Sequence, residues 1–266
     1  NSKAVVEAVK KAIPKIQSGL PKGVKINTFY DRTALIEACI HTVGKALMEG
    51  SIFVIVILFL FLGNFRASVI VALSLPLTAF IAFILMGWQG ITANLMSLGG
   101  LAIALGMIVD ASIVVCENIS RHLSEKTGRG LTRLEIIYEA VREVARPVVF
   151  AILIIVIVFL PLFSLEQMEG KMFRPLAFTM VFAMAGSLLV SLTIVPVLSS
   201  IFMRGRKEEK DNLAIRIVKS GYLPVLQFAL RRPKTVVALA VAVLAVVLLL
   251  VPRVGTEFLP QLDEGA

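Results

Sequence analysis

The residue with the clearest chemical potential in this sequence is a single acid within a long apolar stretch. Asp110 lies in the middle of Asn94 to Cys116, which is otherwise uncharged. A carboxylate at bilayer depth is costly, so such residues generally face protein and bind protons or ions. The structural alternative is a polar side chain that only hydrogen-bonds to a neighbouring helix. We favour a protonation or ion site.

A helix through this stretch places further residues on the face of Asp110, in steps of three and four. The stripe comprises Met96, Gly99, Gly100, Ile103, Gly106, Met107, Asp110, Ile113, Val114 and Glu117. Its glycines would allow another helix to approach closely, so we expect the stripe to face protein and not lipid. Glu117, two turns from Asp110, is a candidate second member of a proton relay. It is equally compatible with a carboxylate that simply reaches water at the membrane edge.

Four methionines suggest a second kind of chemistry. Met96 and Met107 share the stripe of Asp110, and Met180 and Met184 share a face of a later apolar stretch. Thioethers are soft ligands that select Cu(I) and Ag(I) over hard cations. Methionine also fills irregular apolar packing, which is the ordinary explanation for each one taken alone. The four residues are therefore candidate metal ligands with a packing alternative.

The cysteines and histidines predict no site of their own. Cys39 and Cys116 lie on different segments, and His41 is two residues from Cys39, which places the two on different faces of a helix. No further ligand accompanies them at metal-binding spacing. His122, beside Arg121, is interpreted as a polar residue flanking a membrane segment.

The elements that must position these residues are membrane helices. Hydrophobic residues make up 58% of the chain, which is far above the share in a soluble domain. Six stretches are long and apolar enough to cross a bilayer. They are Ala46 to Leu62, Ala67 to Trp88, Asn94 to Cys116, Pro147 to Phe163, Met172 to Met203 and Thr235 to Val251. The fifth is long and should tilt or project from the bilayer.

The net charge of +9 follows the loops and does not indicate nucleic acid. With residues 1–49 outside, the inner loops hold Arg66, six bases from Arg121 to Arg146 and nine from Arg204 to Lys234, sixteen in all. The short outer loops hold three, namely Lys171, Arg174 and Arg253. This distribution satisfies the positive-inside rule. A multi-pass membrane protein is thus predicted.

The first thirty residues suggest a helix, a turn at Pro21 to Gly23 and a strand from Val24 to Phe29. Such a piece cannot bury a core alone, so we expect it to belong to a larger external domain. Both ends of the chain are expected to continue into further protein.

Several runs of residues together resemble one transporter family. They are Tyr30 to Arg32, Leu60 to Asn64, Asn94 to Gly100, Gly106 to Ala111, Glu117 to Asn118, Glu169 to Pro175 and Glu257 to Gly265. Their order and spacing resemble the heavy-metal efflux branch of the resistance-nodulation-division (RND) superfamily. The resemblance covers nearly the whole chain.

The resemblance implies an internal part of a pump with an all-α polytopic membrane bundle, transmembrane helices two to seven, and a small α/β piece of the periplasmic porter domain. Residues 1–43 would end that porter domain, 44–203 would hold helices two to six, and 204–232 a cytoplasmic-side amphipathic helix near Leu213 to Leu230. Residues 233–252 would be helix seven, and 253–266 the start of the second periplasmic domain.

The resemblance also implies the activity. Family members are proton-driven antiporters of the bacterial inner membrane, homotrimers that work with a periplasmic adaptor and an outer-membrane channel. Asp110 matches their proton-carrying Asp, and Glu117 the acid of a Glu-Asn pair. The proton gradient would supply the energy, with no cofactor and no enzymatic reaction. Ala104 stands where the zinc, cobalt and cadmium pumps often have a second Asp, so copper and silver are favoured.

Other functions share some of these features. RND proteins that export drugs or assist secretion also carry an intramembrane Asp, and the methionines and the metal-branch runs disfavour them. An intramembrane aspartyl protease needs a second membrane Asp. Asp31, Asp211 and Asp263 all lie outside the predicted spans. A purely structural membrane bundle would leave Asp110 without a role.

Overall fold

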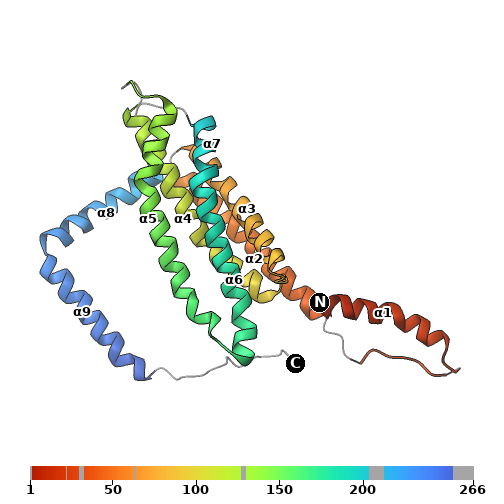
Figure 1. Cartoon of the computed structure of the whole chain (residues 1–266). Helices are drawn as coiled ribbons and strands as arrows, with labels where there is room; N and C mark the ends of the chain where they lie inside the picture. Colours follow the sequence, from red (N-terminus) through yellow and green to blue (C-terminus); the bar gives the residue numbers. More distant parts are fainter. Residues whose placement is uncertain are drawn as a thin grey trace. The chain divides into compact units, whose positions relative to one another are not determined.

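The computed structural model describes residues 2–21, 23–29, 33–62, 64–126, 130–203 and 213–253, and every regular element in these ranges is helical (Figure 1). The α-helices are α1 (Ser2–Ser18), α2 (Thr33–Phe61), α3 (Phe65–Trp88), α4 (Leu95–Lys126), α5 (Arg133–Phe163), α6 (Gln167–Leu189), α7 (Val195–Phe202), α8 (Leu213–Arg231) and α9 (Pro233–Leu250). A π-helical turn, η1 (Val190–Ile194), joins α6 to α7, and a 3-10 turn, η2 (Val251–Arg253), follows α9.

Six helical segments are long and apolar enough to cross a membrane, as the sequence predicted. They are Glu37–Phe61, Phe65–Trp88, Leu95–Lys126, Arg133–Phe163, Gln167–Phe202 and Pro233–Leu250. Three of the helices extend well beyond the predicted apolar stretches. The first of them, α2, begins at Thr33, the helix of Asp110 continues to Lys126, and α5 begins at Arg133. Backbone hydrogen bonding in a helix does not depend on hydropathy, so apolar length alone underestimates all three helices.

Side chains set the starts of two of these helices. At α3, the Asn64 side-chain oxygen accepts hydrogen bonds from the backbone N–H groups of Arg66 and Ala67. Thr132 and Glu135 form a reciprocal capping box at the start of α5. Both arrangements satisfy backbone donors that a helix leaves unpaired at its first turn. The starts of α3 and α5 are thereby defined by side chains.

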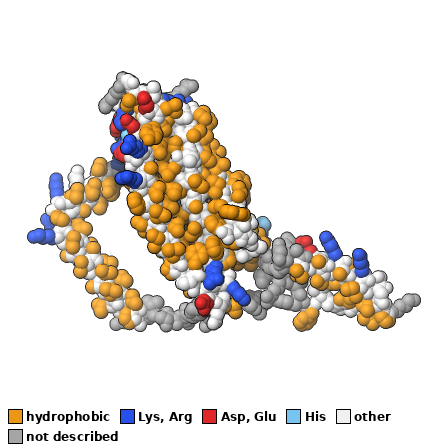
Figure 2. Space-filling view, viewed as in Figure 1, with side chains coloured by type: hydrophobic (Ala, Val, Ile, Leu, Met, Phe, Trp, Pro, Cys, Tyr) orange, Lys and Arg blue, Asp and Glu red, His pale blue; other side chains and the backbone are white. Residues whose placement is uncertain are grey.

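Residues up to Lys210 form one compact unit, in which α4 is the central helix. It contacts α2, α3, α5, α6 and α7. Its buried side chains Ile108, Val115 and Ile119 pack with Ile70 of α3 and Met184 of α6 in one apolar core. Figure 2 shows apolar side chains covering the visible face of this bundle, with charged side chains near its ends. This is the distribution expected for helices surrounded by lipid.

The fifth predicted span is one continuous segment with a π-helical turn. Gln167–Phe202 holds 36 residues and widens into a π-helix at Val190–Ile194. Pro196 follows directly, and its missing N–H removes one helical hydrogen bond. In a π-turn each backbone carbonyl accepts a hydrogen bond from the N–H group five residues later, instead of four as in an α-helix, and this widens the helix. The segment therefore passes Pro196 without ending, and its first part, α6, packs against α4.

At the N-terminus, the predicted helix is confirmed as α1, whereas Val24 to Phe29 pairs with no other strand in the described residues. The side chain of Gln17 takes the place of a neighbouring strand. Its Nε2 donates to the Val24 carbonyl at 2.6 Å, and its Oε1 accepts from the Ile26 N–H at 2.7 Å. The α/β domain proposed for residues 1–43 remains a prediction.

The second unit comprises residues from Asp211 onwards and contains α8 and α9. The predicted amphipathic segment near Leu213 to Leu230 is a helix, α8, and it ends at Arg231. All residues of α9 are exposed in this chain, as expected for a span whose surroundings are lipid or other protein. The runs at Tyr30 to Arg32 and Glu257 to Gly265, and residues 204–212 of the predicted connecting region, lie outside the described residues.

At Gly100, α6 approaches α4 closely. A Cβ atom on Gly100 would lie 2.8 Å from the carbonyl oxygen of Leu176 and 3.2 Å from its Cα. These are backbone atoms, which cannot move aside as a flexible side chain can. Gly100 thus confirms part of the prediction that the glycines of this helix allow another helix to come close.

Replacing Gly100 with alanine should therefore destabilise the bundle. We expect Gly100→Ala to lower the free energy of unfolding by about 1–3 kcal/mol, because the new methyl group forces α4 and α6 apart. Thermal unfolding of the detergent-purified full-length protein would measure this. Gly87→Ala is the matched control, since no atom lies within 4 Å of the added methyl group. Equal melting temperatures for the two variants would contradict the prediction.

Candidate functional site

The helix that carries Asp110 begins with a reciprocal cap. The Ser97 N–H donates to the Asn94 side-chain oxygen at 2.9 Å, and the Asn94 N–H donates to Ser97 Oγ, also at 2.9 Å. These residues belong to the run Asn94 to Gly100, so part of that run serves to start α4. The helix then continues without interruption through Asp110 and Glu117 to Lys126.

This helix has two faces with different environments. One is buried against the other helices of the unit and includes Ala104, Ile108, Val115 and Ile119, each with no exposed surface. The other carries a line of exposed residues at spacings of three and four, which we call the open stripe. Its members are Ile103, Gly106, Asp110, Val114, Glu117 and Arg121. The described helices of the first unit leave this line uncovered.

Asp110 lies in the middle of the open stripe. Its side chain is exposed and makes no hydrogen bond or ion pair with any part of the chain that the structure describes. Gly99 and Gly106 on the same side of α4 have empty space beside them. The predicted close helix approach therefore occurs at Gly100, on the flank of the stripe, and among the described helices of the first unit none packs against the stripe itself.

Glu117 lies two turns beyond Asp110 on the open stripe, as its spacing predicted. Its side chain is exposed, and within the described ranges it has no hydrogen-bond or salt-bridge partner. About 10 Å along the helix axis separates the two acids, because seven residues rise by 1.5 Å each. The structure thus leaves both carboxylates free on one side of one helix.

The four methionines are placed on two helices and in two environments. Met180 and Met184 of α6 are each 1% exposed. Met184 belongs to the apolar core that includes Ile108 of α4. Met96 and Met107 of α4 are half-buried. Among the described residues, no three His, Cys, Asp or Glu side chains form a metal-binding group.

A hydrogen bond close to Asp110 along the helix joins α6 to the buried face of α4. The Ser187 hydroxyl donates to the Ile108 carbonyl at 2.7 Å, and neither residue has exposed surface. Ile108 precedes Asp110 by two residues and points to the opposite side of the helix. Together with the approach at Gly100, this contact fixes the position of the Asp110 backbone.

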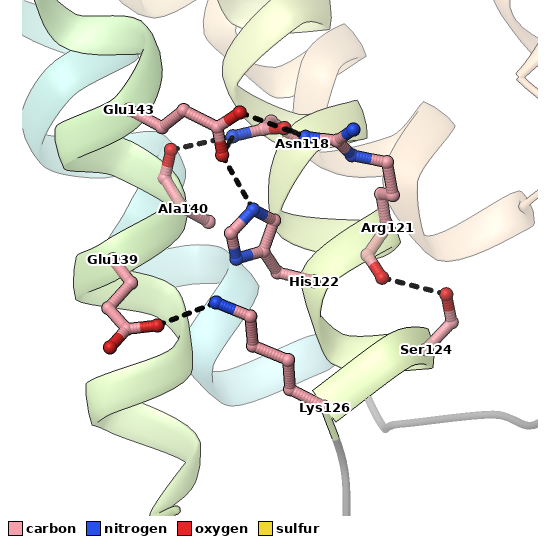
Figure 3. A network of polar contacts seen from close by, with 8 residues as sticks. All are labelled: Asn118, Arg121, His122, Ser124, Lys126, Glu139, Ala140 and Glu143. Atoms are coloured by element: carbon pink, nitrogen blue, oxygen red, sulfur yellow. Dashed lines mark hydrogen bonds and ion pairs between the residues drawn. The ribbon is translucent and has the colours of Figure 1, made fainter.

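At the end of α4 that the charge pattern places inside, a polar cluster joins it to α5 (Figure 3). We call Asn118, Arg121, His122 and Glu143 the inner-end cluster. Arg121 donates to Glu143 Oε1 at 3.1 Å, and His122 Nε2 lies 2.7 Å from Glu143 Oε2. Asn118 donates to the Ala140 carbonyl at 2.7 Å. A separate ion pair, between Lys126 and Glu139, lies nearby at 2.7 Å.

The sequence interpretation missed this cluster and took His122 as a flanking polar residue. His122 is instead only 7% exposed and packs at the contact between the two helices. The sequence contained one indication of the cluster. Glu139 and Glu143 are four residues apart, so their carboxylates share a face of α5. Their partners on α4 could not be inferred, since the pairing depends on how the connection between the helices folds.

The sequence profile of the AcrB/AcrD/AcrF family matches residues 1–266. Among curated proteins, the cobalt-zinc-cadmium resistance protein CzcA of Cupriavidus metallidurans is 44% identical over 271 residues. The cation efflux system protein CusA of Escherichia coli is 42% identical over 275 residues. Both alignments include 100% of this chain, and 25% and 26% of the relative. The chain thus spans about a quarter of the length of these relatives.

Two solved structures are similar to this chain along almost its whole length. Both are X-ray crystal structures of a heavy metal efflux pump, in crystal forms I and II. The TM-scores are 0.77 and 0.80, at 40% and 39% sequence identity. Each covers 99% of this chain, and 24% and 25% of the solved chain.

The hydrogen bond from Ser187 to the Ile108 carbonyl yields a prediction about the stability of the helix bundle. Ser187→Ala should lower the free energy of unfolding by roughly 0.5–1.5 kcal/mol, because the bond between α6 and α4 is lost in a membrane interior. Ser191→Ala is a matched control. Ser191 is equally buried, but its hydroxyl donates to the Leu188 carbonyl within its own segment. Thermal unfolding in detergent would compare the two, and a larger loss in the control would contradict the prediction.

Proposed function

The chain belongs to the AcrB/AcrD/AcrF family, and from this premise we propose that the protein containing it is a proton-driven efflux pump for heavy-metal cations. The family comprises transporters, and the relatives quoted above are metal resistance and cation efflux proteins. The pump is a secondary active transporter and not an enzyme. The observation that carries the proposal is the place of Asp110, an unpaired acid in the middle of a membrane helix and on its uncovered side.

Asp110 is the proton carrier in this proposal. A carboxylate at this depth is stable only against protein or water, because hydrocarbon does not solvate its charge. The open stripe is therefore the side on which a helix from outside this chain packs, with Gly99 and Gly106 leaving room for it. That helix supplies a cationic counter-charge, since the described spans hold no Lys or Arg at the depth of Asp110.

Glu117 is the second member of the relay. The Asp110 carboxyl group gives its proton, through water, to the Glu117 carboxylate. Glu117 then releases the proton to water on the inner side, and Asp110 returns to its charged form. Each step moves one proton between oxygen atoms, from a carboxyl group to water or from water to a carboxylate. The separation of about 10 Å requires intervening water, which the open side of α4 can accommodate.

For the transported metal we propose Cu(I) or Ag(I) in preference to zinc, cobalt or cadmium. Overall sequence identity does not separate copper and silver exporters from zinc, cobalt and cadmium exporters, because CzcA and CusA match this chain almost equally. Two features of individual residues favour copper and silver. Met96, Met107, Met180 and Met184 offer thioether sulfur, which binds soft monovalent ions. Residue 104 is an alanine, so the helix has no second carboxylate six residues before Asp110.

The surroundings of the chain in the complete pump are part of the same proposal. The pump is a homotrimer of the bacterial inner membrane that works with a periplasmic adaptor and an outer-membrane channel. Residues 1–43 contribute to its periplasmic porter domain. The helix α8, which bears Arg216 and Lys219 among apolar residues, lies along the inner membrane surface.

The proton step can be tested with Asp110→Asn in the full-length pump, expressed in a metal-sensitive bacterial strain. The amide keeps the size of the side chain but cannot cycle a proton, so tolerance should fall to that of cells without the pump. Immunoblots of membranes should show normal amounts of the variant. Glu125→Gln removes another exposed acid of α4 and is the control, with tolerance expected to match wild type. Full tolerance with Asp110→Asn would refute the proton role.

The metal can be tested in the same strain with copper, silver, zinc, cadmium and cobalt salts. Wild type should protect against copper and silver only. Met184→Leu, a substitution of similar volume, should reduce that protection at normal protein amounts, because it removes a proposed thioether ligand of the metal. Protection against the divalent ions would instead place the pump in the other metal group. Protection against none of the five would favour drug export or a role in secretion.

A further inference from the structure

Arg121 lies within reach of two different carboxylates, and the structure shows it with one of them. On its own helix, Glu117 precedes it by four residues, and both belong to the open stripe. On α5, Glu143 faces it across the contact between the helices (Figure 3). The guanidinium group binds Glu143 at 3.1 Å, and it makes no ion pair with Glu117. Glu117 is free of an ion pair as long as Arg121 binds Glu143 and not Glu117.

We propose that Glu143 is a positioning residue that holds Arg121 away from Glu117 and so keeps Glu117 available to exchange protons. This inference rests on the proposed function, in which Glu117 passes on the proton of Asp110. It adds a role for a residue on α5 that does not itself touch the proton path. Glu143 acts only through Arg121.

The contacts of Glu143 are suited to such a role. Its Oε1 accepts from Arg121, and its Oε2 lies 2.7 Å from His122 Nε2 and 3.3 Å from Asn118 Nδ2. Asn118 and His122 are only 8% and 7% exposed, so two of the three partners are fixed by packing. Asn118 Oδ1 also accepts from Arg121, at 2.8 Å. The arginine is therefore bound on two sides by groups whose own positions are set.

Without Glu143, the spacing on α4 favours the other pairing. Residues four apart on a helix are neighbours, and an acid that precedes a base by four residues is the more favourable order. Glu117 and Arg121 have this order, and both are exposed enough to move. The Glu117 carboxylate would then be occupied by the guanidinium group of Arg121 and would not be available to the proton that Asp110 releases.

The test uses the full-length pump reconstituted in lipid vesicles, with a pH-sensitive dye inside and the transported metal added as substrate. Glu143→Gln keeps the size of the side chain and removes its charge. We expect the maximal rate of metal-dependent proton flux per pump to fall about fivefold, as one exposed ion pair allows, with an unchanged KM for the metal. Glu143→Ala, which leaves no acceptor for Arg121, should show at least the same fall.

The double variant Glu143→Gln/Arg121→Gln separates this mechanism from simple loss of structure. With the arginine also removed, nothing competes for Glu117, so the rate should return to within about twofold of wild type, the scatter expected from a few tenths of a kcal/mol. A purely structural role predicts that the double variant is as slow as Glu143→Gln or slower. Glu139→Gln is the matched control, because it breaks the ion pair with Lys126 between the same two helices and leaves Arg121 untouched.

The outcomes are distinct. A slow Glu143→Gln pump with a restored double variant supports the inference. A normal rate for both Glu143→Gln and Glu143→Ala overturns it, and so does a double variant that stays slow. If the wild-type pump exports metal without moving protons, the proposed function fails and this inference fails with it. Wild-type proton flux that is lost in Asp110→Asn but unchanged in both Glu143 variants overturns the inference alone.

Discussion

The packing of α6 against α4 determines the arrangement of the rest of this bundle. At Gly100 the two backbones come so close that a methyl group would not fit, and at Ile108 the Ser187 hydroxyl binds the α4 carbonyl. In a membrane interior such close backbone contacts and interhelical hydrogen bonds replace much of the hydrophobic driving force between helices. Once α4 is held in this way, its opposite side, with Asp110, is turned outward from the unit. The same contact thus supports the fold and orients the acid.

The two ends of the functional segment of α4 are secured by different means. Asn94 and Ser97 cap its start, and the inner-end cluster joins its last turns to α5. Between them the helix presents acids on its uncovered side and apolar residues on its covered side. The proposed proton carrier requires a rigid support, and the packing of the covered side of α4 supplies it. Arg121 belongs to the open stripe and to the inner-end cluster, and so connects the two.

Much of the fold followed from the pattern of residues. The six apolar stretches appear as six long helices, and α1 and α8 are where periodicity placed helices. Helix ends were harder to predict, because Glu117 to Lys126 and Arg133 to Arg146 are polar and yet helical. The π-turn before Pro196 also escaped prediction, since a proline can equally end a helix. The extended segment after α1 has a side chain of Gln17 in place of a second strand, which strand propensity alone does not reveal.

The sequence by itself determined that Asp110 and Glu117 share one line of a membrane helix, because helical periodicity fixes which residues lie on a common face. It also determined the number of spans, through length and hydropathy. Only the tertiary structure decided which face of α4 is covered, that Gly100 and not Gly99 or Gly106 meets α6, and that Arg121 binds Glu143. These outcomes depend on contacts between helices that are far apart in the chain. Backbone carbonyls such as that of Ile108 are present at every residue, so only the packed structure shows which of them is bound.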